Sequence, residues 1–284
     1  MNKKIFLCAI SNISSGSCNE DCAFCTQAAR YKADIERYRH KPIETIVADA
    51  KAAKANGAHG MCLVTAGKGL DEKKLAFVIE ACRAVKAEVE GLLLIACNGT
   101  ATLEQLQSLK AAGIDAYNHN LETSRNFYPK ICTTHDWDER LETCKNVKKA
   151  GLALITGGIF GMGETHEDRL DMLRTIASLE PMSVPLNFFH PNEALPIKNN
   201  LGSIEEALSL IILAREIIPE PARIMIAGGR EITFKERQNE IFAAGADAIV
   251  IGNYLTTSGE EPGKDLQMIK NAGYEVAGPE DCRE

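Results

Sequence analysis

Short apolar segments alternate with longer amphipathic segments along the chain, and glycines or polar turns separate them. A short apolar run between turn residues is typical of a buried strand, whereas apolar positions three and four residues apart indicate a helix. The predicted strands are Ile5–Ile10, Gly60–Thr65, Leu92–Cys97, Ala116–Leu121, Leu152–Phe160, Val184–Phe189, Arg223–Ala227 and Ala248–Ile251. The predicted helices include Ile43–Asn56, Glu72–Glu88, Leu103–Ala112, Trp137–Ala150, His166–Leu179, Ser203–Ile217 and Phe234–Ala244.

The order of these elements predicts the fold class. Several helices are followed by a glycine before the next strand, at Gly57, Gly113, Gly151 and Gly245, and glycine suits a left-handed helix cap. Alternating strand and helix units predict an α/β fold, a parallel (β/α)8 TIM-type barrel, as a single domain over residues 1–284. An open doubly wound sheet is the alternative. We prefer the barrel because no G-x-G-x-x-G motif follows the first strand.

Composition and charge narrow the class of protein. The chain of 284 residues is 45% hydrophobic and 25% charged, with a net charge of −7. Nucleic-acid binding would need clustered Lys and Arg, and no apolar run approaches the roughly 20 residues that span a membrane. The apolar stretch near the N-terminus is too short for a signal peptide. Ten cysteines without a secretion signal favour a reducing cytoplasm, where clustered cysteines more often bind metal than form disulfides.

Three cysteines follow the first predicted strand with C-x3-C-x2-C spacing: Cys18, Cys22 and Cys25. Thiolates hold iron–sulfur clusters, and a cubane usually takes four of them. Three thiolates therefore leave one iron open to a small chelating molecule. A zinc site is the alternative, but zinc sites usually pair their ligands as C-x2-4-C twice, and no second pair follows. In a barrel, chemistry gathers at the C-terminal strand ends, where this loop is expected.

The fuller string C-x-E-D-C-x-[FY]-C-x-Q, which ends at Gln27, resembles the signature of radical S-adenosylmethionine (SAM) enzymes and, more narrowly, of the biotin synthases. The likeness extends from about Cys8 to about Gly263. It implies a [4Fe-4S] cluster whose fourth iron is chelated by SAM. An electron from a donor such as flavodoxin or ferredoxin would then cleave SAM to methionine and a 5′-deoxyadenosyl radical. Phe24 is expected to pack near the adenine.

The fourth predicted strand contains the polar string Y-N-H-N-L-E-T-S. Strand alternation predicts that Asn118, Asn120 and Glu122 share one face. Polar groups inside a barrel are costly unless they meet a ligand or each other, and a structural polar layer is the alternative. The string resembles the family's Y-N-H-N-L-[DE]-T-S. The resemblance implies that Asn120 lies between substrate and SAM and that Glu122 binds the ribose hydroxyls.

The resemblance also implies functional roles for Arg140, for the motif at residues 157–164 and for Asn187. Arg140 would otherwise be a solvated helix charge, but here it is expected to pair with the SAM carboxylate. Residues 157–164 match the G-x-I-x-G-x-x-E motif of radical SAM barrels, with a glycine-rich turn capped by Glu164 as the alternative. A lone Asn187 among apolar residues usually satisfies backbone groups. The resemblance implies that it binds the ureido ring of dethiobiotin, since an amide both donates and accepts.

The resemblance also implies an auxiliary cluster inside the barrel that supplies sulfur. In the best-known members it is a [2Fe-2S] cluster bound by three cysteines and one arginine. Cys62 and Cys97 match two of these ligands, but the other two positions are Ile155 and Met225. Buried free cysteine is also common as a small hydrophobe.

Another cysteine is expected to compensate for the two missing ligands. Cys8 is our first choice, because barrel strands one, three, five and seven share layers, although its inward face cannot be read from the sequence. Cys132 is the alternative. With changed ligands, the auxiliary cluster is either [2Fe-2S] or a larger cluster with an extra sulfide.

These features predict an enzyme that inserts sulfur into dethiobiotin to make biotin, after hydrogen abstraction from two unactivated carbons. We expect a cytoplasmic homodimer that binds neither nucleic acid nor membrane. A maturase or mutase on the same barrel is the first alternative, and it would hold no iron beyond one cubane. A non-catalytic iron–sulfur electron carrier is the second, and SAM would not perturb its spectrum.

Overall fold

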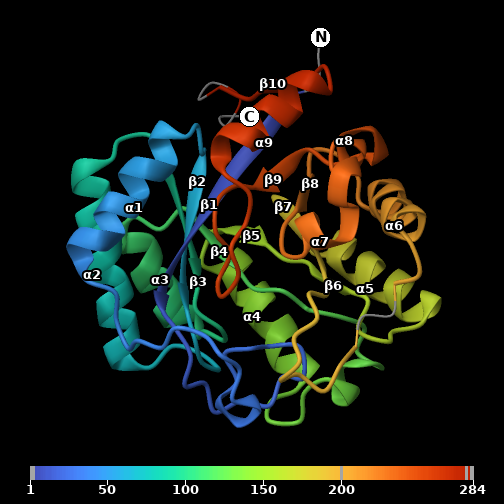
Figure 1. The fold of residues 1–284 in the computed structure, drawn as a ribbon. Helices are drawn as coiled ribbons and strands as arrows, with labels where there is room; N and C mark the ends of the chain where they lie inside the picture. The colour runs from blue at the N-terminus through green and yellow to red at the C-terminus, as the bar shows by residue number, and fades with distance from the viewer. Residues whose placement is uncertain (1–3, 199–200, 279–280, 282–284) are drawn as a thin grey trace.

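Parallel strands close into a barrel in the computed structural model, which describes residues 4–198, 201–278 and 281 (Figure 1). The strands are β1 (Lys4–Ser14), β2 (Gly60–Thr65), β3 (Leu93–Cys97), β4 (Ala116–Asn118), β5 (Ala153–Ile155), β6 (Gly158–Phe160), β7 (Ser183–Phe188), β8 (Arg223–Ile226), β9 (Ala248–Val250) and β10 (Glu275–Val276). Pairing of β1 with β9 closes the sheet. Because β5 and β6 both pair with β7, they share one of eight strand positions, and the predicted barrel is confirmed.

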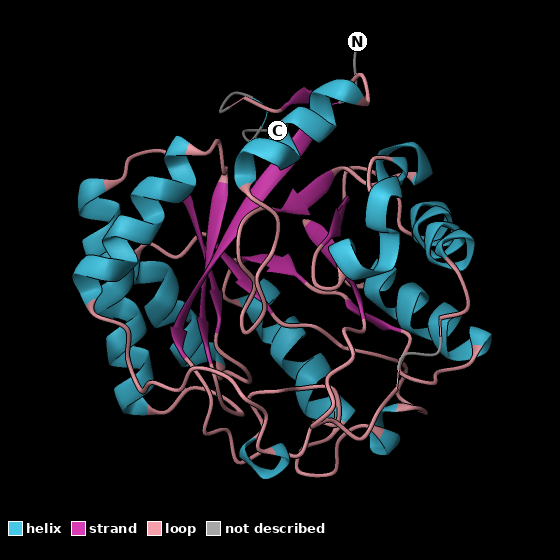
Figure 2. Ribbon diagram, in the orientation of Figure 1, coloured by secondary structure: helices cyan, strands magenta, loops and turns pink. Residues whose placement is uncertain are grey.

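Helices surround the strands on the outside of the barrel (Figure 2). They are α1 (Ile43–Ala55), α2 (Glu72–Glu88), α3 (Leu103–Ala112), α4 (Trp137–Lys149), α5 (His166–Ser178), α6 (Ile204–Ile217), α7 (Arg230–Phe234), α8 (Glu240–Ala244) and α9 (Pro262–Asn271). Capping boxes at Thr102, Asp136 and Thr165 satisfy the free backbone N–H groups at the starts of α3, α4 and α5. The predicted cap glycines have positive φ, from 72° at Gly151 to 123° at Gly245.

Several predicted elements were wrong in their extent, among them the strand expected over Ala116–Leu121, which ends at Asn118. The strand expected over Leu152–Phe160 is interrupted between β5 and β6. There the Gly157 backbone lies so close to Pro185 that a Cβ would be 1.9 Å from the Pro185 carbonyl oxygen. The helix expected over Phe234–Ala244 is divided between the end of α7, a 3-10 turn at Lys235–Arg237 and α8. The sequence analysis did not predict α9 or β10.

The fold separates the two ends of the barrel. The start of β1 and strand β10 lie at one end, and the loop that follows β1 lies at the other, where the strands end (Figure 1). The large apolar core fills the space between sheet and helices, while a second apolar cluster includes Cys8, Cys62, Ile95 and Ile155 from neighbouring strands. No helix among the described residues is both long and apolar enough to cross a membrane.

Candidate active site

The three cysteines of the C-x3-C-x2-C motif lie in the loop after β1. Backbone hydrogen bonds fix this loop: Cys18 N–H donates to the Gln27 carbonyl over 3.1 Å, and Ala29 N–H donates to the Cys18 carbonyl over 2.9 Å. All three thiols are half-buried. Burial raises the pKa of Cys18, and it raises the pKa of Cys25 to about 11. A metal bound here would have to displace thiol protons, because the thiolate is the ligand.

Asp21 fastens the cysteine loop to residues 131–135, a segment between β4 and α4. Its carboxylate accepts hydrogen bonds from the backbone N–H of Thr133 over 2.9 Å and of Thr134 over 3.2 Å, and from both threonine hydroxyls. Ala23 N–H also donates to the Ile131 carbonyl over 2.8 Å. Burial opposes ionisation, but the hydrogen bonds hold the pKa of Asp21 well below its usual range. The sequence analysis missed this connection.

The polar string after Tyr117 does not continue as a strand. β4 ends at Asn118, and Glu122 has a φ of 69°, so strand alternation does not place Asn118, Asn120 and Glu122 on one face. The chain bends because the Leu121 and Glu122 N–H groups both donate to the Gly157 carbonyl, over 2.9 and 3.2 Å. The expected alternation was wrong. Asn120 and Glu122 nevertheless lie together, since the Arg140 guanidinium donates both to the Asn120 carbonyl and to Glu122 Oε1.

Arg140 lies beside this polar string and forms a buried ion pair. Its Nη2 atom is 3.0 Å from Glu122 Oε1, and its Nε donates to the Asn120 carbonyl over 2.6 Å. Among the described residues, Glu122 Oε2 has no hydrogen-bond partner although it is buried. Burial raises the pKa of the Glu122 carboxyl, and Arg140 opposes that rise. A buried, unpartnered carboxylate oxygen fits a ligand with hydroxyl donors.

Asn187 and Glu164 have backbone partners of their own. Asn187 donates to the Gly158 carbonyl over 3.2 Å and accepts from the Gly228 N–H over 2.9 Å, so it joins neighbouring strand ends. Glu164 accepts hydrogen bonds from the Gly161 and Met162 N–H groups and from Arg169. Glu164 therefore caps the glycine-rich turn, as the alternative interpretation of this motif expected. Asn187 retains one amide hydrogen that a ligand could use.

The barrel interior brings three of the predicted auxiliary ligands together. Cys8 and Cys62 are buried in the same cluster, and Cys97 packs against it. A hydrogen bond to the Cys8 thiol, together with burial, raises the pKa of Cys62 well above its usual range. Ile155 and Met225 contribute apolar surface to the same cluster. Cys8 therefore faces inward, which the sequence left open.

Cys132 lies elsewhere, in the 131–135 segment beside the cysteine loop. Its Sγ is 3.7 Å from the Sγ of Cys22 and 3.3 Å from His135 Nδ1. The hydrogen bond from Cys22, more than its other contacts, lowers the pKa of Cys132 to about 4. The sequence analysis considered Cys132 only for the interior cluster and missed His135. The C-x2-H spacing of the two residues was the available signal.

Comparison with known proteins places the chain in a family. The Radical SAM superfamily model matches residues 12–176, and the Biotin and Thiamin Synthesis associated domain matches residues 185–275. Biotin synthase of a Sulfurovum species is 63% identical over 97% of this chain and 96% of that protein. Biotin synthase of Sulfurimonas denitrificans is 61% identical, over 98% of this chain and 99% of that protein. The chain belongs to the biotin synthase family.

Solved structures of other proteins share this fold. The FeFe-hydrogenase maturase HydG from Carboxydothermus hydrogenoformans superposes with a TM-score of 0.83 at 18% identity, covering 95% of this chain and 67% of that one. Methylornithine synthase has a TM-score of 0.80 at 20% identity, covering 98% and 85% of the two chains. At such identities these structures bear on the fold alone, and they agree with the barrel of this biotin synthase family member.

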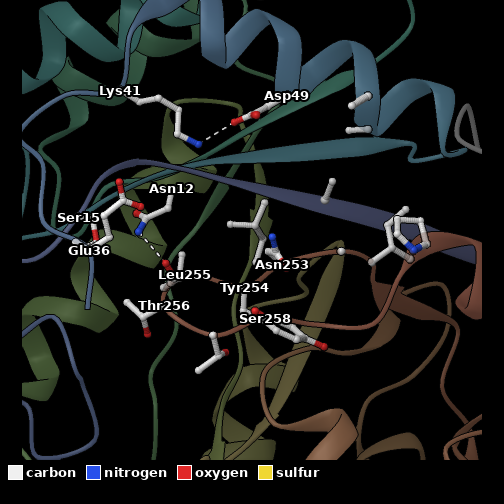
Figure 3. Close-up of a pocket in the computed structure, with 18 of the residues that line it drawn as sticks. Asn12, Ser15, Glu36, Lys41, Asp49, Asn253, Tyr254, Leu255, Thr256 and Ser258 are labelled. Carbon is white, nitrogen blue, oxygen red and sulfur yellow. Dashed lines mark hydrogen bonds and ion pairs between the residues drawn. The ribbon is translucent and has the colours of Figure 1, made fainter. Parts of the chain in front are cut away.

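A pocket of about 480 Å³ opens on the outside of this biotin synthase barrel, between β1 and residues 252–258 (Figure 3). Asn12 donates to the Leu255 carbonyl across it over 2.9 Å, and Lys41 pairs with Asp49 on its opposite side. None of the site residues predicted from the sequence lines this pocket. The residues predicted to carry the chemistry lie at the strand ends and inside the barrel instead.

Proposed function

We propose that this chain is a biotin synthase that uses SAM to insert sulfur into dethiobiotin. The carrying observation is the 63% identity to a biotin synthase over 97% of the chain. The direct test is anaerobic reconstitution with iron and sulfide, followed by addition of SAM, a reductant and dethiobiotin. Biotin should form and be detected by mass spectrometry, together with methionine and 5′-deoxyadenosine. SAM cleavage without biotin would favour a maturase or mutase, and no SAM cleavage would favour an electron carrier.

The residues at the strand ends fit the groups that this family needs. Cys18, Cys22 and Cys25 would hold the [4Fe-4S] cluster, since the loop that follows β1 contains all three as free cysteines. Cys8, Cys62 and Cys97 would hold the auxiliary cluster, [2Fe-2S] or larger. When bound, the cubane and SAM together supply a 5′-deoxyadenosyl radical, and the auxiliary cluster supplies sulfur.

The remaining site residues bind and orient the two small molecules. Glu122 would accept hydrogen bonds from the SAM ribose, because its Oε2 is buried without a partner among the described residues. Arg140 would turn part of its guanidinium from Glu122 to the SAM carboxylate. Asn120, whose carbonyl accepts a hydrogen bond from Arg140, would lie between SAM and substrate, and Phe24 would pack on the adenine. The electron donor we propose is a flavodoxin or ferredoxin, acting on a cytoplasmic homodimer.

Glu122→Ala and Arg140→Ala should each weaken SAM binding ten- to a hundred-fold. Loss of one charge-assisted hydrogen-bond partner costs about 1.5–3 kcal/mol, which corresponds to roughly this range of affinity. The dissociation constant for SAM should be measured by calorimetry on the reconstituted protein. Arg125→Ala is the control, because Arg125 is exposed and pairs with Asp138 at the surface. Wild-type affinity in both site variants would contradict their roles.

Asn187→Ala should weaken dethiobiotin binding while SAM binding stays near the wild-type level. The side chain can both donate to and accept from the ureido ring, and an apolar replacement leaves the ring unpaired. Asn187→Asp is the matched variant, since it keeps an acceptor for the Gly228 N–H but loses the donor. Equal loss of both ligands would instead report damage to the strand ends that Asn187 joins.

A further inference from the structure

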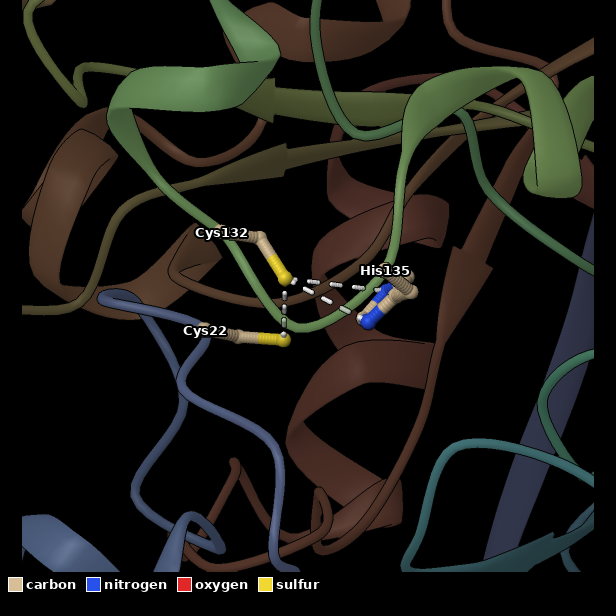
Figure 4. A group of neighbouring side chains, drawn as sticks. All are labelled: Cys22, Cys132 and His135. Atoms are coloured by element: carbon tan, nitrogen blue, oxygen red, sulfur yellow. Dashed lines mark hydrogen bonds between the residues drawn. The ribbon is translucent and has the colours of Figure 1, made fainter.

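Cys22, Cys132 and His135 form a cluster of metal-ligating side chains that the proposed function does not use as a unit (Figure 4). One atom from each lies within 4.8 Å of the other two. Cys132 and His135 are buried, and Cys22 is half-buried. The cysteine loop supplies Cys22, while the 131–135 segment supplies the other two.

The spacing of these atoms is that of ligands on a single metal atom. Tetrahedral zinc takes thiolates at about 2.3 Å and imidazole at about 2.0–2.1 Å, so two sulfurs lie about 3.8 Å apart, and sulfur and nitrogen about 3.5 Å apart. Here Cys22 Sγ and Cys132 Sγ are 3.7 Å apart, and Cys132 Sγ is 3.3 Å from His135 Nδ1. Cysteines on different irons of a cubane are farther apart, because each iron carries one of them.

We propose that, before a cubane is assembled, Cys22, Cys132 and His135 bind one tetrahedral divalent cation, Fe²⁺ or Zn²⁺. Both cations accept thiolate and imidazole ligands.

Neighbouring residues complete the site. The other ring nitrogen of His135, Nε2, lies 2.7 Å from the Tyr128 hydroxyl and 3.2 Å from Arg140 Nη1, and these two neighbours hold the ring with Nδ1 toward Cys132. Glu20 Oε2 is 2.6 Å from Nδ1 and accepts its hydrogen bond. A cation that displaces the Nδ1 proton frees this carboxylate to serve as the fourth ligand. The hydrogen bonds of Asp21 to Thr133 and Thr134 hold the two halves of the site together.

Cys22 belongs to both this site and the proposed cubane, so the single cation and the cubane cannot both use its thiolate as a terminal ligand at the same time. A Fe²⁺ ion here would lie beside the place where the cubane is built. A Zn²⁺ ion would compete for Cys22 and delay assembly. Binding of the single cation does not depend on SAM or dethiobiotin, and it can be tested apart from catalysis.

Cobalt(II) titration of the cluster-free chain tests the site. Under strictly anaerobic conditions, wild-type protein should bind Co²⁺ with thiolate-to-cobalt charge-transfer absorption and tetrahedral ligand-field bands. Cys132→Ser and His135→Gln should lower the affinity at least ten-fold. Cys18→Ala and Cys8→Ala should leave it unchanged, because neither thiol belongs to the site. Zn²⁺ and Fe²⁺ should each displace the cobalt, and their competition constants show which is held more tightly.

The Cys18 and Cys132 variants distinguish the proposed site from a cation site formed by the C-x3-C-x2-C loop alone. If Cys18→Ala loses the cobalt spectrum and Cys132→Ser keeps it, the cation binds within the C-x3-C-x2-C loop and the proposal is overturned. A cobalt spectrum that both variants keep would also overturn it. Circular dichroism confirms that each variant is folded. Cys132→Ser should still assemble a SAM-responsive cubane, and its loss would make Cys132 a cluster residue instead.

Discussion

Cys22→Ala should abolish SAM cleavage. The remaining Cys18 and Cys25 would leave a cubane with two thiolates, and cluster binding depends on thiolate ligation. The measurement is 5′-deoxyadenosine formation by the anaerobically reconstituted protein with a chemical reductant. We expect the same result for Cys18→Ala and Cys25→Ala. Cys144→Ala is the control, since Cys144 is buried in α4 and its thiol donates to the His119 carbonyl over 3.2 Å.

A neighbouring thiol could replace Cys22 as a cluster ligand and so preserve some SAM cleavage in the Cys22→Ala variant. Cys132 Sγ lies 3.7 Å from Cys22 Sγ, so it is the cysteine placed to substitute for Cys22. The double variant Cys22→Ala/Cys132→Ala removes that route. Residual cleavage in Cys22→Ala that disappears in the double variant would identify the substitution. Undiminished cleavage in both would show that Cys22 is not a cubane ligand.

Cys8→Ala should lose the auxiliary iron and sulfide but retain SAM cleavage. Cys8 faces the barrel interior with Cys62 and Cys97, where Ile155 and Met225 offer no thiolate or guanidinium ligand. Biotin formation should therefore fall to background, while 5′-deoxyadenosine still forms. Iron and sulfide analysis with Mössbauer spectroscopy measures the loss directly. Cys82→Ala is the matched control, because Cys82 is buried in α2 among the helices.

Alkylation tests independently whether the Cys8 thiolate is bound to iron. Cys8 should resist alkylation in the reconstituted protein and react after chelation of the iron. Cys132, the alternative ligand, lies beside the cysteine loop and not in the interior cluster. If Cys8→Ala keeps its full iron and sulfide, the auxiliary cluster has a ligand other than Cys8 or is absent. If the auxiliary cluster is absent, the proposed function of sulfur insertion is wrong.

The barrel was predictable because its signals are local. Alternating apolar segments and cap glycines such as Gly113 each depend on a few neighbouring residues, and the structure follows them. The C-x3-C-x2-C motif was equally local, so its place after the first strand followed from the order of elements. The end of β4 at Asn118, the break at Gly157 and the divided helix after Phe234 departed from this pattern. At Gly157 the departure coincides with the close approach of Pro185, a distant part of the chain.

The detailed site could not be predicted because it depends on contacts across the chain. Glu122 leaves the strand conformation through hydrogen bonds to Gly157, which is far away in sequence. Asp21 meets Thr133 only once the loops after β1 and β4 approach each other. Alternation could not tell which face of β1 points inward, so the direction of Cys8 needed the closed barrel.

The attachment of Asp21 to the 131–135 segment bears on the entropy of cluster binding. Fixing a residue's backbone costs roughly 1–2 kcal/mol, and a free cysteine loop would meet that cost when its metal binds. Here the Thr133 and Thr134 N–H groups donate to Asp21, and these hydrogen bonds order the loop as part of folding. We therefore expect a chain that has lost its cluster to oxygen to keep its ligands close to position. We expect such a chain to be reloaded rather than replaced, so that one polypeptide can outlast several clusters.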